Sequence, residues 1–171
     1  MRHVLRIRLF LVVLVGGHLL SLPFAYAQDT WDRYKEGTIA GIIIQERDNV
    51  AESFSTPAHH VAVSAENFPT RTSVLYMDSL RSILPENLEV IRHWAVSLRV
   101  DPAALTAFQH ELLFREDTLD FWLPVQEVLV PSFRAELRRG DSATLFVLWV
   151  GAWGAIKEIN WVFIVNEFLK E

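Results

Sequence analysis

The sequence predicts an α+β fold, in which N-terminal strands and a C-terminal antiparallel hairpin form one sheet or small open barrel covered by helices. Three observations predict it. Residues 38–44 are rich in β-branched side chains, apolar residues recur at helical spacing after Pro85, and residues 143–168 are almost continuously apolar. The predicted order along the chain is therefore strands, then helices, then strands.

Short apolar segments predict the N-terminal strands. Residues 38–44 have the sequence Thr-Ile-Ala-Gly-Ile-Ile-Ile and are followed by the polar stretch 45–49, which predicts a strand and a turn. Two further apolar runs, at residues 61–64 and 72–77, are separated by Glu-Asn-Phe-Pro, a composition typical of a turn. The first part of the domain is thus expected to be mostly β.

Two consecutive amphipathic helices are predicted in the middle of the chain. The first begins at Pro85, and the second at Asp101-Pro102, an N-cap acid before a first-turn proline. In each, the apolar residues recur at the spacing of one helix face. They are Leu88, Ile91, Ala95 and Leu98 in the first helix and Leu105, Phe108 and Leu112 in the second.

A short third helix is predicted between Pro131 and Gly140. Two arginines precede Gly140, which is the pattern of a cationic last turn followed by a C′ glycine. Residues 121–129, between the second and third helices, fit neither the helical nor the strand period.

The two last apolar runs, residues 143–156 and 159–168, predict a buried β-hairpin that turns at Lys157-Glu158. A membrane helix is the alternative. It is disfavoured because the first run has about 14 residues, against the roughly 20 of a spanning helix, and contains Gly151 and Gly154. No membrane span is therefore expected in residues 28–171.

Residues 1–27 have the pattern of a cleavable signal peptide. Three arginines without an acid precede the apolar stretch 9–24, and Ala25-Tyr26-Ala27 offers small residues at the positions before the cut. The alternative, an uncleaved anchor, requires roughly 20 apolar residues, and this run has about 16. We expect cleavage after Ala27 and a periplasmic or secreted protein.

Residues 28–171 have the size of one domain. The 16 basic residues of the chain include three in the leader, so 13 remain against 21 acidic ones, a net charge of about −8. This balance disfavours nucleic-acid binding. The chain has no cysteine, which excludes disulfides and lipid attachment to a thiol, and the core must rest on packing of its apolar and aromatic residues.

His59-His60 is a weak candidate for a transition-metal site, since adjacent imidazoles in a loop can bind a metal. No third ligand stands at a recognised spacing, so ordinary surface histidines are the simpler interpretation, and no metal or other cofactor is predicted. His110-Glu111 matches the start of a zinc-protease helix motif, but position 114, where that motif has its second histidine, is Phe.

Charged pairs at helical spacing are interpreted as surface features. Glu111 with Arg115 and Glu89 with His93 stand at the i, i+4 spacing of a helix ion pair. His93 and His110 both lie opposite the apolar stripes, so they are expected to face solvent. The acidic residues within 116–120 lack the pattern of a calcium loop and are interpreted as a charged helix end.

Trp149, Gly151, Trp153 and Trp161 are the candidate ligand-binding residues. On a regular strand the first three point the same way, which leaves a gap between two indoles for a sugar ring or an apolar peptide. The alternative is that the rings fill the core and that Gly151 makes space for a neighbouring helix.

The sequence therefore favours an exported non-catalytic domain that binds a partner protein, a peptide or a cell-wall component, because no catalytic motif is recognisable. One alternative is an exported hydrolase or metal-dependent enzyme using some of His59, His60, Glu111 and Asp117. Another is a subunit of a larger assembly with an exposed aromatic interface.

Overall fold

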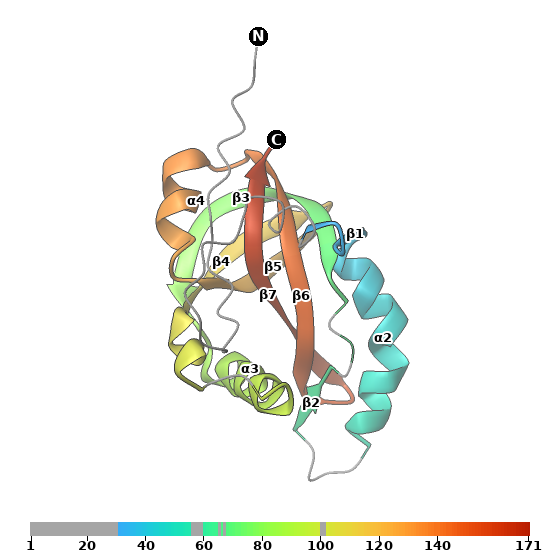
Figure 1. Cartoon of the computed structure of the whole chain (residues 1–171). Helices are drawn as coiled ribbons and strands as arrows, with labels where there is room; N and C mark the ends of the chain where they lie inside the picture. The colour runs from blue at the N-terminus through green and yellow to red at the C-terminus, as the bar shows by residue number, and fades with distance from the viewer. Residues whose placement is uncertain (1–30, 56–59, 65, 67, 100–101) are drawn as a thin grey trace. The chain divides into compact units, whose positions relative to one another are not determined.

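Helices and strands interleave along the part of the chain that the computed structural model describes, which is residues 31–55, 60–64, 66, 68–99 and 102–171 (Figure 1). The elements are β1 Lys35–Glu36, α2 Ile39–Ser53, β2 Val61–Val63, β3 Thr70–Ser82, α3 Pro85–Ser97, the 3₁₀ helix η1 Pro102–Ala107, β4 Phe108–Glu116, β5 Leu119–Gln126, α4 Val130–Glu136, β6 Ser142–Ala155 and β7 Glu158–Lys170. Contacts divide the chain into Met1–Arg33, of which only residues 31–33 are described, and Tyr34–Glu171. The predicted leader 1–27, His59 and Asp101 lie outside the described residues.

The described strands form a seven-stranded mixed sheet in the order β1-β3-β4-β5-β7-β6-β2. β3 pairs twice, antiparallel to β6 through residues 70–75 and antiparallel to β4 through residues 75–82. The pairs β1–β3 and β5–β7 are parallel, and the others are antiparallel. The α+β class is confirmed, and the predicted strands at 61–64 and 72–77 correspond to β2 and β3.

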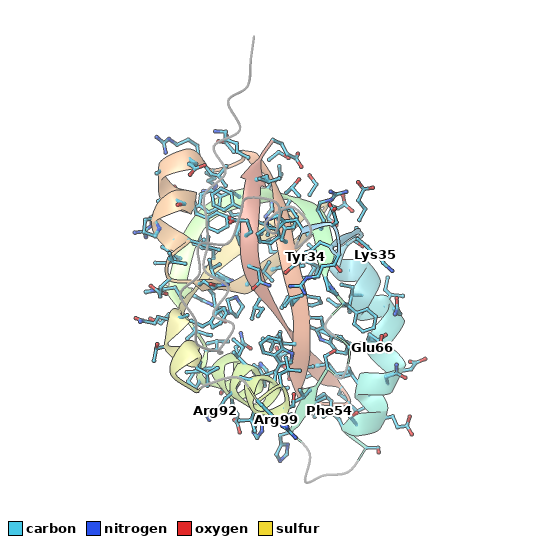
Figure 2. The ribbon with its side chains drawn as sticks, in the orientation of Figure 1. Tyr34, Lys35, Phe54, Glu66, Arg92 and Arg99 are labelled. Carbon is cyan, nitrogen blue, oxygen red and sulfur yellow. The ribbon has the colours of Figure 1, made fainter. Side chains whose placement is uncertain are left out.

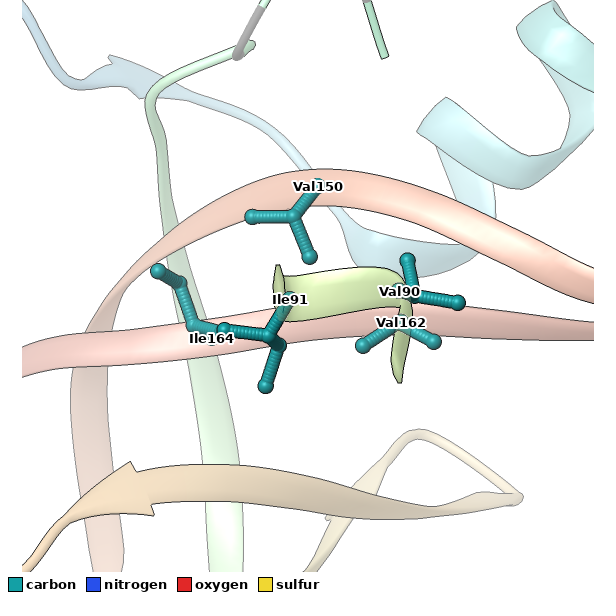
Figure 3. Close-up of a cluster of buried hydrophobic side chains, with 5 residues drawn as sticks. All are labelled: Val90, Ile91, Val150, Val162 and Ile164. Carbon is teal, nitrogen blue, oxygen red and sulfur yellow. The ribbon is translucent and has the colours of Figure 1, made fainter. Parts of the chain in front are cut away.

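α3 confirms the first of the two predicted central helices, and it packs on the C-terminal hairpin. Its Val90 and Ile91 are fully buried against Val150 of β6 and against Val162 and Ile164 of β7 (Figure 3). Burial of such side chains contributes about 1.5–3 kcal/mol each. This contact attaches α3 to β6 and β7.

A second packing centre forms around Phe133 of α4. Its ring stacks on Phe168 of β7 at 3.9 Å between centroids and also contacts Tyr76 and Phe114. Phe133 is 0% exposed. The short helix is therefore held by one aromatic side chain inserted between β3, β4 and β7. α4 confirms the predicted third helix but ends at Glu136, whereas Gly140, at φ +89°, belongs to the loop before β6.

The predicted strand at residues 38–44 is wrong, because this segment is the first part of α2. The Thr38 hydroxyl accepts the N–H of Gly41, and the Glu116 carboxylate accepts the N–H groups of Ile39 and Ala40. Two side chains thus satisfy the N-terminal donors. The buried positions 39, 42, 46 and 50 follow helical spacing. The stabilisation from this packing outweighs the low helix propensity of the β-branched residues, which costs less than about 0.7 kcal/mol each.

The second predicted helix is also wrong. Only η1 is helical there, and residues 108–116 form β4 between β3 and β5. Leu112, Phe114 and Glu116 are buried at alternate positions, as in a strand with one face on the core. The residues Leu105, Phe108 and Leu112 match helical spacing as well, so the flanking strands decide the conformation.

Three charged features follow from β4 being a strand. The predicted pair between Glu111 and Arg115 does not form, because residues four apart on a strand lie about 13 Å apart; Arg115 binds Asp120 instead. Residues 116–120, predicted as a helix end, comprise the last residue of β4, a turn at residues 117–118 and the first residues of β5, with Asp117 at φ +52°. His110 contacts Glu127 at 2.8 Å.

The Glu89 and His93 pair on α3 is present, at 3.7 Å.

The predicted C-terminal hairpin is confirmed as β6 and β7, which turn at residues 156–157. Residues 121–129, which fit neither the helical nor the strand period, contribute most of β5. Within the described part of the chain, none of the helices has the length and apolar character needed to cross a bilayer.

Candidate functional site

Glu111 lies at the centre of a polar network on the outward side of β4. Its neighbours Leu112 and Phe114 are in the core, whereas Glu111 points out of the sheet yet is 0% exposed. One carboxylate oxygen accepts the Nε–H of Arg81 at 2.5 Å, and the other accepts Nδ2–H of Asn87 at 2.5 Å. Both oxygens of the buried acid are therefore engaged.

The network joins four elements. Arg81 of β3 lies opposite Glu111 in the antiparallel register of β3 and β4. Asn87 stands in the first turn of α3, which begins at Pro85. Its Oδ1 accepts the indole N–H of Trp153 from β6 at 2.6 Å. The network thus fixes where α3 crosses the strands and how the Arg81 side chain leaves β3.

The guanidinium of Arg81 reaches the surface. Its Cζ lies 4.4 Å from the ring centroid of Trp122, and 35% of the side chain is exposed, against 0% for Glu111. Within the described part of the chain, the terminal nitrogens of Arg81 make no hydrogen bond, and no buried side-chain nitrogen or oxygen lacks a partner. These nitrogens therefore face solvent.

Trp122 and Leu113 form an apolar row beside Arg81. They are directly opposite each other on β5 and β4, and both are half-buried. In the next row Arg115 binds Asp120 through two hydrogen bonds of 2.6 and 3.0 Å. The hydrogen bond from Arg115 holds the pKa of the Asp120 carboxyl below its usual value. We call Arg81, Leu113 and Trp122 the Arg81 face.

This arrangement is suited to binding. A buried carboxylate and an indole ring hold the guanidinium in one orientation, so its free N–H groups are already positioned for an acceptor. Glu111 is buried and uses both oxygens within the protein, so it cannot itself contact a ligand on this face.

The tryptophans singled out from the sequence separate into two environments. The Trp149 ring packs on Trp161 at 5.6 Å and on Phe68 at 5.7 Å, whereas Trp153 binds Asn87 on the α3 side. A register shift between Trp149 and Gly151 breaks the regular alternation that would have aligned the two indoles.

Protein atoms fill the space at Gly151. A Cβ there would lie 2.2 Å from the Ala62 carbonyl oxygen of β2 and 2.9 Å from Val90 of α3. Gly151 therefore makes space for a strand and a helix, as the alternative interpretation of this motif expects.

The other candidate residues are not brought together. His59 lies outside the described residues, and His60 is exposed, where its carbonyl accepts the N–H of Gly154. Glu111 and Asp117 are separated by roughly 20 Å of strand and turn. Among the described residues, no three His, Asp or Glu side chains form a cluster that could hold a metal ion.

An apolar hollow of about 330 Å³ lies beside α3, bounded by η1 and the start of β4. It is lined by Leu88, Arg92, Leu105, Thr106, Phe108 and Gln109. Arg92 is exposed on α3 (Figure 2). The hollow is open to solvent and, unlike the Arg81 face, holds no buried polar group among the residues that line it.

Sequence reasoning missed Arg81, Asn87 and Trp122. A signal was available, because Glu111 directly precedes the apolar residues 112–114, and a charge buried on a strand there requires a partner. The partner could have been found by extending the strand at 72–77 to Ser82, which brings Arg81 into register with Glu111.

Comparison with protein-family models and with curated proteins finds no significant match to this chain.

Proposed function

We propose that this chain is exported, and that residues 28–171 act as a non-catalytic binding domain of the cell envelope or extracellular space whose ligand contacts the Arg81 face. One observation carries the proposed site: Arg81 is fixed by the buried Glu111 and by Trp122 while its terminal nitrogens remain open to solvent. The leader-like pattern of residues 1–27 supports export.

We also propose that β3, β4, β5, β7 and β6 form a small closed barrel. The support is that each of these strands pairs with the next and that β6 pairs with β3 again. The connectivity is like that of OB-type five-stranded barrels, because α4 lies between β5 and β6, the third and fourth of these strands in chain order. Such barrels bind ligands on the face of their second and third strands, which here are β4 and β5. This analogy supports the location of the site on β4 and β5.

Export is tested by the mature N-terminus. The native full-length chain is produced in its own cell, and the protein is recovered separately from the cytosolic and extracytoplasmic fractions. We expect the N-terminal sequence to begin at Gln28 outside the cytosol, and Ala27→Phe to block processing because the cleavage site needs a small residue. A full-length, soluble, cytosolic protein would contradict export.

The binding site is tested by photo-crosslinking in the same cell. A photoreactive amino acid replaces Leu113 on the Arg81 face, and a matched control places it at Ile44 of α2, which is 77% exposed. We expect an adduct from position 113 that is absent from position 44 and is lost in Trp122→Ala. Equal labelling at both positions, or none at 113, would exclude the Arg81 face as the binding site.

A further inference from the structure

We infer that the ligand of the Arg81 face presents a single carboxylate to the two terminal nitrogens of Arg81, next to an apolar or aromatic group that packs on Trp122 and Leu113. This inference rests on the proposed function and deepens it by assigning the chemical class of the ligand. It follows from the hydrogen-bonding capacity of Arg81, from the surface beside it and from the charge of the chain.

Arg81 has four N–H groups left for a ligand. A guanidinium has five N–H groups in a fixed plane, and Glu111 takes the one on Nε at 2.5 Å. The remaining four belong to the terminal nitrogens, which face solvent. Two of these can bind the two oxygens of a carboxylate in parallel, a geometry that Lys cannot reproduce.

Trp122 limits the directions from which a ligand can reach the guanidinium. Trp122 lies 4.4 Å below Cζ and covers one face of the group, so an acceptor approaches along the guanidinium edge. Leu113 is directly opposite Trp122 in the register of β4 and β5. A ligand whose carboxylate reaches Arg81 therefore places its adjacent atoms over an apolar row.

The charges around Arg81 favour a small ligand over a polyanion. Arg115, the neighbouring cation, uses Nε and one terminal nitrogen on Asp120, whereas Arg81 keeps both terminal nitrogens open, so Arg81 offers the paired terminal donors. The Glu111 carboxylate already balances the charge of Arg81, and residues 28–171 carry a net charge of about −8. Long-range attraction is thus weak, and a polyanion is repelled. Recognition must rest on short-range geometry, which a single carboxylate satisfies.

The test is a comparison of two small probes that differ only in the acid. Residues 28–171 labelled with ¹⁵N are titrated with N-acetylphenylalanine and, separately, with its neutral amide. We expect the acid to shift the Nε–H signal of Arg81 and the indole N–H signal of Trp122 in a saturable manner, with a dissociation constant about tenfold below that of the amide, corresponding to about 1.4 kcal/mol. A third arm with phenyl phosphate is expected to bind more weakly than the acid.

Two variants check the assignment. Arg81→Lys keeps the charge but loses the planar pair of donors, and Trp122→Leu removes the ring from an outward position that the core does not use. Both are expected to weaken binding of the acid at least about fivefold, while Arg71→Lys, a change in an exposed ion pair with Glu36, is expected to have no effect. If Arg81→Lys does not fold, the affinity of Trp122→Leu for the acid tests the assignment instead.

The inference is overturned if acid and amide bind equally, if phosphate binds better than carboxylate, or if the shifts lie only at the hollow beside α3. Its failure is distinct from that of the proposed function. If position 113 crosslinks but the acid and the amide bind equally, only the carboxylate assignment is wrong. If position 113 does not crosslink and no probe binds, the Arg81 face is not the binding site.

Discussion

The carboxylate of Glu116 holds the N-terminus of α2 from 77 residues away along the sequence, accepting the N–H of Ile39 at 2.8 Å. Its second oxygen accepts the N–H of Ala40 at 3.0 Å, and the Thr72 hydroxyl donates to the first at 2.6 Å. The side chain is 4% exposed. A strand residue therefore supplies the cap that a local residue would usually provide.

Replacing Glu116 by Gln is expected to destabilise the protein by about 1–3 kcal/mol, because the amide offers one acceptor where two backbone donors need partners. Urea unfolding of residues 28–171 measures this. Asp117→Asn, which removes a carboxylate from the adjacent turn position, is the matched control and should change stability by less than about 0.5 kcal/mol. Equal effects of the two changes would show that charge, rather than the helix cap, is responsible.

Gly151→Ala is expected to destabilise by more than about 2 kcal/mol or to prevent folding. Its Cβ would meet the Ala62 carbonyl oxygen at 2.2 Å, a backbone atom that cannot move without shifting β2. Gly140→Ala serves as the comparison, since Gly140 also has positive φ but has nothing within 4 Å of the added atom, so about 1–2 kcal/mol of backbone cost remains. Thermal unfolding of both variants separates the cost of the steric clash from the cost of placing an alanine at positive φ.

Stability is expected to decline at alkaline pH because of Tyr76. Burial, followed by the charge of Asp78, raises the pKa of its phenol from the usual value of 10.0 to about 12. Below pH 10 the phenol is neutral in both states, and its contribution is fully present. Between pH 10 and about 12 the unfolded state alone ionises, so stability falls with rising pH.

Urea unfolding between pH 9 and pH 12 measures this decline, and Tyr76→Phe is expected to make the profile flatter in that range. Tyr34 is the other tyrosine of residues 28–171 and remains as an internal reference. An unchanged slope in Tyr76→Phe would contradict the assignment.

Ile91→Ala is expected to cost about 2–5 kcal/mol, because Ile91 is 0% exposed and its loss leaves a cavity between α3, β6 and β7. Val96→Ala on the same helix is the control. Val96 is 61% exposed, so its truncation should change the free energy of unfolding by less than about 0.5 kcal/mol. Comparable effects from both would mean that α3 is not seated as described.

The sequence predicted those elements whose pattern is strong and local. The β6 and β7 hairpin is long and apolar, and α3 has both a first-turn proline and an apolar stripe. The errors at α2 and β4 have another origin. The isoleucines of α2 favour a strand locally, and Phe108 and Leu112 fit a helix equally well, so distant partners, Glu116 for α2 and the flanking β3 and β5 for β4, decide both.

The candidate site could be predicted only in part. The sequence indicates Glu111 and Trp153 as candidates, each for another role. Only the register between β3 and β4 and the position of α3 place Arg81 and Asn87 beside them. Residues far apart in sequence form the network, so no local motif contains it. The site is therefore hard to predict from the sequence because its residues are far apart along the chain.

The double pairing of β3 determines when the fold can be completed. Residues 70–75 of β3 pair with β6, and β6 lies in the last 30 residues of the chain. Residues 75–82 of β3 pair with β4, which comes much earlier. During synthesis, an emerging chain therefore keeps an open strand edge until β6 is available. A chain cut short before residue 142 would leave that edge permanently available for aggregation.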